Sequence, residues 1–225
     1  MDTIIQILAR ELGRSEAHVE NVVRLIDEGN TIPFIARYRK ELHGAMDDTA
    51  LRTLADRLQY LRNLDKRREE VKSAIEGQGK LTEELSAAID AAATLAEVED
   101  LYRPYKQKRR TRATVAREKG LEPLAELLFA QAADGPAPEE AAGAFIDPEK
   151  GVETAEDALQ GASDIIAERI SDDADIRKRL RELVWKKGSL VSAAAAKEPE
   201  DTVYRLYYAF RSPLNRVQGH QVLAI

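Results

Sequence analysis

Cysteine is absent from the 225-residue chain, which excludes disulfide bonds and cysteine-ligated metal sites. Aromatic residues make up only 5% of the sequence. No apolar run approaches the roughly 18 residues that cross a membrane. The first residues, Met1 to Ile4, do not open the basic-then-apolar pattern of a secretory signal. We therefore expect a cytoplasmic protein without a membrane partner.

The patterns of common catalytic sites are also missing. The three histidines are far apart in the sequence, and no His-Glu-x-x-His, Gly-x-Ser-x-Gly or Gly-x-x-x-x-Gly-Lys stretch occurs. Acidic pairs such as Asp47/Asp48 and Asp172/Asp173 stand at expected helix starts, where attraction to the helix dipole explains them. We expect no enzymatic activity, no cofactor and no metal site.

The residues that are abundant favour helices. Alanine, leucine, glutamate and arginine are frequent, and charged residues make up 33% of the chain. Apolar residues recur at helical spacing in three short segments of residues 4–41, which Gly13 and Gly29 separate. Pro33 suits the first turn of the third segment. Residues 1–46 are therefore predicted to form a helix-turn-helix-like bundle.

The longest predicted helix begins at Asp47 and Asp48 and ends at Gly77. Its leucines follow a spacing of three and four residues, and a helix of about 29 residues would span roughly 43 Å. The apolar stripe is interrupted at Arg68, so we expect it to pack on other helices of the chain rather than in a dimeric zipper. The predicted fold is all-α and multi-helical, with this long helix at its centre.

Proline and glycine gather in residues 132–153, which are the predicted hinge. Further helices are expected after Thr154 and Ser171, and residues 189–196 fit either a strand or a helix. Residues 221–225 are typical of the start of a buried strand, and we expect the chain to be a piece of a longer protein. The predicted segments are 1–46 (bundle), 47–131 (long helix and basic helical segment), 132–153 (linker), 154–220 (second helical region) and 221–225 (start of a further domain).

Positive charge is concentrated in one stretch. The chain has a formal charge of −6, yet residues 101–120 hold eight Lys or Arg against one acid, which is +7. Phosphates bind lysine and arginine, and exposed bases stack on aromatic rings. The stretch also holds Tyr102 and Tyr105, and Tyr38 lies in a smaller mixture of the same kind. The candidate nucleic-acid-binding residues are Arg37, Arg39, Lys40, Arg103, Lys106, Lys108, Arg109, Arg110 and Arg112.

The residues alone leave a second interpretation open. Tyr102 and Tyr105 can anchor a core, and the arginines can pair with the acids of residues 97–100 or with acidic helices elsewhere. The basic segment would then contact protein, or the chain's own domains, rather than nucleic acid. The solvent exposure of Arg109 and Arg110 distinguishes the two interpretations, because burial of these side chains in ion pairs would favour a scaffold.

Two stretches together resemble the signatures of a known family. Residues 32–41 (Ile-Pro-Phe-Ile-Ala-Arg-Tyr-Arg-Lys-Glu), with Gly44 and Asp47 after them, resemble the first signature of the bacterial Tex family of transcription accessory proteins. Residues 99–113 and 116–125 resemble the second signature. A weaker third block is similar at 165–168 with Arg177. Arg103, Gln107 and His43 depart from the leucine, proline and threonine that the family pattern leads us to expect.

This resemblance implies a helical N-terminal region that precedes an RNase H-like domain without a complete catalytic site. Residues 222–225 would then begin the first strand of that domain. The implied partners are RNA or DNA, the transcription machinery and downstream domains of a longer protein. The implied role is non-catalytic support of nucleic-acid binding through a basic surface, and the alternative is a protein-interaction or intramolecular scaffold.

Overall fold

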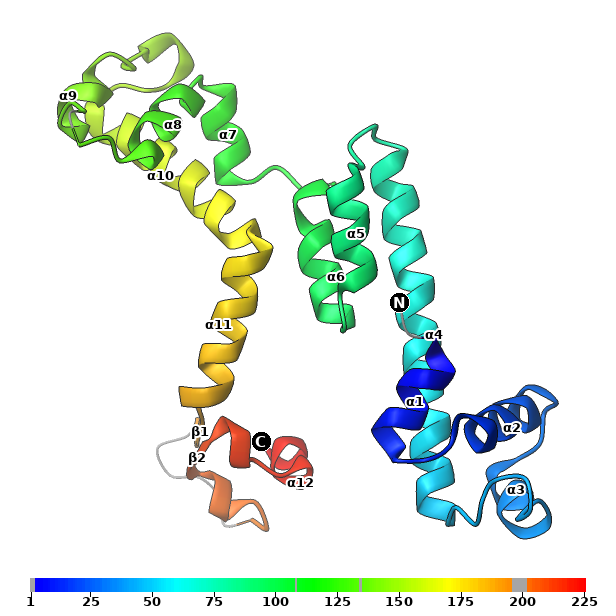
Figure 1. Cartoon of the computed structure of the whole chain (residues 1–225). Helices are drawn as coiled ribbons and strands as arrows, with labels where there is room; N and C mark the ends of the chain where they lie inside the picture. The colour runs from blue at the N-terminus through cyan, green and yellow to red at the C-terminus, as the bar shows by residue number, and fades with distance from the viewer. Residues whose placement is uncertain (1–2, 108, 134, 196–201) are drawn as a thin grey trace. The chain divides into compact units, whose positions relative to one another are not determined.

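A computed structural model describes residues 3–107, 109–133, 135–195 and 202–225. These residues form helices and one short two-stranded sheet, which confirms the predicted mostly helical fold (Figure 1). The chain divides into two compact units, Met1–Tyr105 and Lys106–Ile225. No helix in the described parts is long and apolar enough to cross a membrane.

The first unit begins with three short helices, α1 (Ile4–Leu12), α2 (Glu16–Asp27) and α3 (Ile32–Tyr38). Thr3 and Gln6 form a reciprocal capping box at the start of α1, and Gly13 ends that helix in the left-handed region at φ +61°. Ser15 caps α2 through its side chain, and Pro33 lies in the first turn of α3. Local capping chemistry therefore sets the bounds of the predicted N-terminal bundle.

Helix α4 (Asp48–Glu76) is the long helix of the first unit and has 29 residues. Asp47 caps it by accepting a 2.7 Å hydrogen bond from the backbone amide of Ala50. The predicted apolar stripe is buried along its length and consists of Leu51, Leu54, Leu58, Leu61, Leu64, Val71 and Ile75. At the interruption, Arg68 donates a 2.7 Å hydrogen bond to the carbonyl oxygen of Ala92. The stripe is thus covered by other helices of the same unit, as expected.

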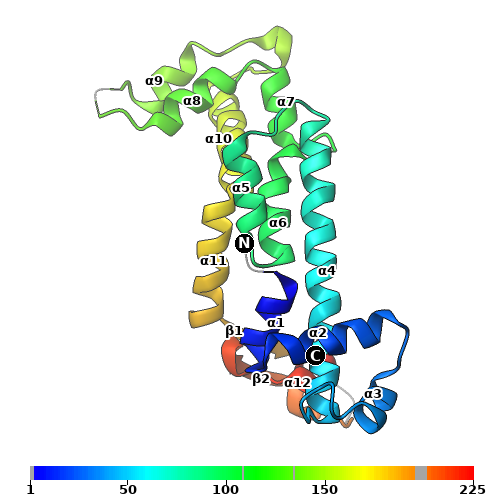
Figure 2. The same ribbon diagram turned by 45° about the vertical axis from the view of Figure 1, so that its right-hand side comes forward.

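Helices α5 (Glu83–Ala91) and α6 (Leu95–Tyr102) lie beside α4 (Figures 1 and 2). The hydroxyl of Tyr60 on α4 accepts a 3.2 Å hydrogen bond from the amide of Leu95. A 3-10 turn, η1 (Arg103–Tyr105), follows α6 directly. The first unit therefore has one continuous core that reaches from α1 to Tyr105.

The second unit is built around a helix that carries small residues. Its helices are α7 (Arg112–Glu118), α8 (Glu122–Ala130), α9 (Pro138–Gly143), the 3-10 turn η2 (Pro148–Lys150) and α10 (Ala155–Asp172). Helix α10 contacts α7, α8 and α9. Ala158 and Ala162 of α10 are fully buried, and Gly161 lies between them in sequence. A Cβ atom on Gly161 would come within 2.3 Å of Cδ1 of Leu121, so this glycine permits the close approach.

The predicted hinge contributes to the second core. Ala141, Ala142 and Val152 of residues 132–153 are buried there, and the two compact units meet in sequence after Tyr105. The short apolar faces of this segment pack onto α10 despite the prolines and glycines around them. The five-segment division of the chain stays a prediction.

The last part of the second unit is more exposed. Helix α11 (Ala174–Lys187) has no buried residue. Strands β1 (Ser189–Ala193) and β2 (Ala209–Pro213) pair antiparallel, with Val191 opposite Arg211, so the strand alternative holds for residues 189–193. The 3-10 turns η3 (Arg205–Tyr207) and η4 (Leu214–Arg216) lie on either side of β2.

The strand predicted at residues 221–225 is wrong. Gly219–Ala224 forms a short helix, α12, and Gln218 and Gln221 cap its start. The amide of Gln218 donates a 2.9 Å hydrogen bond to the side chain of Gln221. A strand needs a partner to satisfy its backbone groups, whereas a helix satisfies them locally.

Candidate nucleic-acid interface

The basic stretch begins where α6 ends. The turn η1 follows Tyr102 directly and contains Pro104, and a proline cannot continue the helical hydrogen bonding. Tyr102 and Tyr105 are partly buried and pack against the first core. The carbonyl oxygen of Tyr105 accepts a 3.0 Å hydrogen bond from Nε2 of Gln78. The two tyrosines therefore anchor the chain, as one of the two interpretations of the sequence foresaw.

Arginines of the basic stretch are exposed to solvent. Arg103, Lys106, Arg109, Arg110 and Arg112 all lie on the surface. Arg110 pairs with Glu118 at 2.7 Å, and both side chains are open to water, with relative exposures of 69% and 54%. Such a surface ion pair contributes at most about 1 kcal/mol.

Arg109 and Arg112 make no ion pair or side-chain hydrogen bond with the described residues. Lys108 lies outside the described residues. The described arginines are therefore not held in buried ion pairs.

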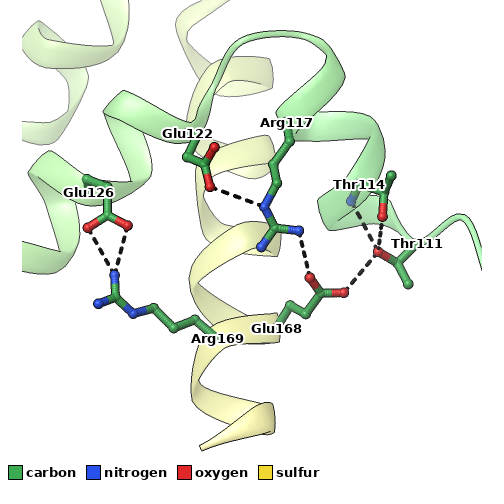
Figure 3. A network of polar contacts seen from close by, with 7 residues as sticks. All are labelled: Thr111, Thr114, Arg117, Glu122, Glu126, Glu168 and Arg169. Carbon is green, nitrogen blue, oxygen red and sulfur yellow. Dashed lines mark hydrogen bonds and ion pairs between the residues drawn. The ribbon is translucent and has the colours of Figure 1, made fainter. Parts of the chain in front are cut away.

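Two other cations of the stretch hold the second unit together. Nη1 of Arg117 bonds Glu168 of α10 at 2.7 Å, and its Nε lies 3.4 Å from Glu122 (Figure 3). The hydrogen bond to Glu168 raises the pKa of Arg117. Nζ of Lys119 donates a 2.7 Å hydrogen bond to the carbonyl oxygen of Gly151. These cations are structural, unlike the exposed arginines.

Glu168 is a structural residue that the charge pattern did not reveal. Its second carboxylate oxygen accepts a 3.0 Å hydrogen bond from the hydroxyl of Thr111, which also caps α7 (Figure 3). Its partners lie more than fifty residues earlier in the chain. The one sequence signal was the third block of family resemblance, residues 165–168.

A second basic cluster surrounds the end of α3, in the first unit. Arg37 and Lys40 are exposed. The guanidinium of Arg39 lies 5.4 Å from the ring centroid of Phe34 and donates a 3.3 Å hydrogen bond to the carbonyl oxygen of Tyr38. The predicted site residues thus belong to two different units, with residues 37–40 and Arg103 in the first and residues 106–112 in the second.

Comparison with known proteins finds two family matches in sequence order. The Tex-like protein N-terminal domain matches residues 2–76, and the Tex central region-like family matches residues 134–225. The uncharacterized protein YdcI of Bacillus subtilis is 48% identical over 98% of this chain and 31% of its own length. The transcriptional accessory protein Tex of Neisseria gonorrhoeae is 41% identical over 99% of this chain and 29% of its own length.

A human protein, S1 RNA-binding domain-containing protein 1, is 31% identical over 99% of this chain and 23% of its own length. The chain spans less than a third of the length of each of these relatives. The first signature stretch lies within the N-terminal family match, and the alignments with these relatives extend over both stretches. The chain belongs to the Tex family of transcription accessory proteins and holds the family's N-terminal domain and central region.

Proposed function

We propose that this chain supports RNA or DNA binding by a Tex-family protein, through the exposed cations of residues 103–112 and a smaller contribution from residues 37–40. The observation that carries the proposal is the exposure of Arg109, Arg110 and Arg112, with only the surface pair to Glu118 among them. By contrast, Arg117 and Lys119 of the same stretch donate hydrogen bonds to Glu168 and Gly151 and stabilise the fold. Arg109 and Arg112 make no such bonds with the described residues, which favours a role in binding a ligand.

The negative net charge of the chain does not oppose this proposal. Ionic screening limits an exposed charge to about 10 Å at 0.1 M salt. A phosphate near Arg109 and Arg112 therefore responds to the local excess of positive charge rather than to the −6 of the whole chain. Each phosphate that is neutralised releases condensed counterions, which drives binding at low salt.

The names of relatives agree with this role. The gonococcal relative is called a transcriptional accessory protein, and the human relative is named for RNA binding. We propose that this chain works in the cytoplasm with the transcription machinery and with further domains of a longer chain. The proposal assigns it no reaction, cofactor or metal ion.

Fluorescence anisotropy at low salt tests the proposal on the 225-residue chain. The probes are labelled single-stranded RNA and duplex DNA of about twelve nucleotides or base pairs, at roughly 50 mM salt. The test variant is Arg109→Ala with Arg112→Ala. The control variant, Arg52→Ala with Lys66→Ala, removes the same charge from the exposed surface of α4. We expect binding that the test variant weakens several-fold and that the control leaves unchanged.

Absence of binding by the wild-type chain to both probes would overturn the proposal. An equal loss in the two variants would also overturn it, because the effect would then come from net charge rather than from the basic stretch.

A second candidate function, a protein-docking scaffold, is favoured by α11. Four apolar side chains of this helix are about half exposed, Leu180, Leu183, Val184 and Trp185. Exposed apolar surface of this kind is typical of interaction sites. The relatives continue for more than twice the aligned length, so we propose that further segments of a longer Tex-type chain cover this face.

Trp185 reports on this candidate, because it is the only tryptophan of the chain. Its emission should move to shorter wavelength when the chain is embedded in a full-length Tex-type protein whose other tryptophans are replaced. Unchanged emission would contradict docking on this face.

A further inference from the structure

We propose that the second unit holds one unstacked base of a single-stranded nucleic acid, in a cavity between α7 and α10. This inference rests on the proposed function and adds a base-binding site to it. The cavity has a volume of about 400 Å³. Cavities that bind small ligands commonly measure about 300–1,000 Å³.

Apolar residues form the floor of this cavity. Val115 and Ala116 of α7 line it together with Leu121 and Gly161. Ala116 and Leu121 are almost completely buried, so they lie at the bottom. A flat base can pack its faces against apolar side chains, as extruded bases do in protein pockets.

Arginines of the proposed nucleic-acid surface line the same cavity. Arg110 and Arg112 line it and are exposed. Lys119 also lines it, and its bond to Gly151 uses one of the three ammonium protons. A base in the cavity therefore has cations beside it for its own phosphates. Cations that follow the backbone are one of the features of proteins that bind single strands.

The α10 side of the cavity carries hydrogen-bond acceptors. Gln160 and Asp164 are one helical turn apart and line the same wall as Asp157. Asp157 is already used, because its Oδ2 accepts hydrogen bonds from the amides of Glu153 and Thr154 at 3.2 and 3.0 Å. Asp164 receives only a long 3.4 Å bond from Gln160 in the described structure.

The carboxylate of Asp164 selects the kind of base, because only its Oδ1 accepts the long bond from Gln160 and other acceptor sites remain. A carboxylate accepts a hydrogen bond from an exocyclic amino group, such as N4 of cytosine. Uracil has a carbonyl oxygen, O4, in that position, which a carboxylate repels. The cavity therefore favours a base with an exocyclic amino group over uracil.

Anisotropy with two homopolymers tests this site on the 225-residue chain. Labelled oligo(C) and oligo(U) RNA of about twelve nucleotides are compared at the same salt. We expect the wild-type chain to bind oligo(C) roughly tenfold more tightly. Asp164→Ala should reduce the preference to about twofold or less, and Glu156→Ala is its control, because it removes the same charge from α10 outside the cavity.

A second variant fills the cavity without changing charge. Val115→Phe should lower the affinity for oligo(C) to that for oligo(U) while the dependence on salt stays the same. Circular dichroism checks that each variant keeps its helix content. Unlabelled cytidine monophosphate in excess distinguishes a site for a free nucleotide from a site for a base within a strand. We expect it to compete only weakly, because the strand supplies further phosphate contacts.

The outcomes separate this inference from the proposed function. Two results would overturn the proposal that the cavity binds a base: salt-dependent binding without preference for oligo(C), or a preference that survives Asp164→Ala and Val115→Phe. Either result leaves the proposed function standing. Cytidine monophosphate that binds as tightly as the strand overturns the assignment to a strand. No binding of either homopolymer overturns the base-binding site, and the proposed function is then decided by the duplex DNA probe.

Discussion

Arg112 and Arg117 belong to the same short helix, yet their surroundings differ. Helix α7 packs on α10 through Ala113 and Ala116, which are buried. Arg117 meets Glu168 at the edge of this contact, whereas Arg112 is exposed at the first turn. Identical side chains in one basic stretch thus serve the fold in one case and remain available to a ligand in the other.

Replacing each of these arginines should separate the two roles. Arg117→Ala removes the 2.7 Å ion pair to Glu168, whose side chain is only 16% exposed. We expect a loss of roughly 1–3 kcal/mol in the free energy of unfolding. Arg112→Ala should change that free energy by no more than about 0.5 kcal/mol. Urea denaturation measures both, and equal effects would contradict the structural role of Arg117.

Ion pairs between elements of the first unit make its stability depend on pH. Arg57 of α4 contacts Glu11 of α1 through two bonds of 2.7 Å, and Arg62 pairs with Asp27 of α2. The hydrogen bond from Arg57 lowers the pKa of Glu11, and that from Arg62 lowers the pKa of Asp27. A carboxylate with a lowered folded pKa stabilises the fold above its unfolded pKa, and this stabilisation is lost as the pH falls through the folded value.

Glu11→Gln should therefore destabilise the chain at neutral pH and not in acid. The pair is partly exposed, so we expect a loss of about 0.2–1 kcal/mol at pH 7. The difference from wild type should shrink as the pH falls below the ordinary glutamate value of 4.5. Urea denaturation at a series of pH values measures it, and a difference that is constant with pH would contradict the pairing.

Gly161 tests how α10 packs against its neighbours. Glycine to alanine inside a helix normally stabilises it by about 0.5–1 kcal/mol. Here the new Cβ would lie 2.3 Å from Leu121 and 3.3 Å from Ala116. Overpacking costs roughly 1–3 kcal/mol, so we expect Gly161→Ala to lower the melting temperature.

Gly143→Ala is the matched control, because a Cβ on Gly143 meets nothing within 4 Å. It should leave the melting temperature unchanged or slightly raised. A stabilising Gly161→Ala would show that the helices do not approach as closely as described.

The elements that the sequence predicted well are those with local signals. Helix α4 has both an aspartate cap and a glycine after its end, and a regular apolar stripe runs between them. The strand predicted at residues 221–225 failed because a short apolar run fits a helix or a strand equally. The hinge was placed by its prolines and glycines, whereas burial of Ala141, Ala142 and Val152 depends on contacts with α10.

At the candidate site, the charge pattern predicted which residues are basic. It did not predict which of these cations stabilise the fold and which are exposed. That division depends on Glu168 and Gly151, which are distant from the basic stretch in sequence. The cavity beside Arg110 and Arg112 also needs α10, which charge pattern alone cannot place. Contacts of long sequence separation account for both.

The described residues form two cores that share no residue. The first is rich in leucine, isoleucine and valine and lies within residues 8–98, while the second is rich in alanine and lies within residues 113–165. Each core lies within its own unit, and residues 103–112 of the basic stretch connect the two in sequence. This arrangement explains why an exposed, charged segment can be kept between two folded parts.

Residues 1–105 should fold without the rest of the chain. All of the residues of the first core are present in this piece. We expect helical circular dichroism and a single cooperative thermal transition. A non-cooperative transition would show that the first unit needs the second for its stability.

The salt dependence of binding tests the central claim most directly. The logarithm of the binding constant for a single strand falls with the logarithm of the salt concentration, by a slope of about 0.7 for each phosphate that is neutralised. If Arg109 and Arg112 each contact a phosphate, replacing both with alanine should flatten the slope by about 1.4. The Arg52→Ala, Lys66→Ala control should keep the wild-type slope. An unchanged slope in the Arg109→Ala, Arg112→Ala variant would contradict nucleic-acid binding through this stretch.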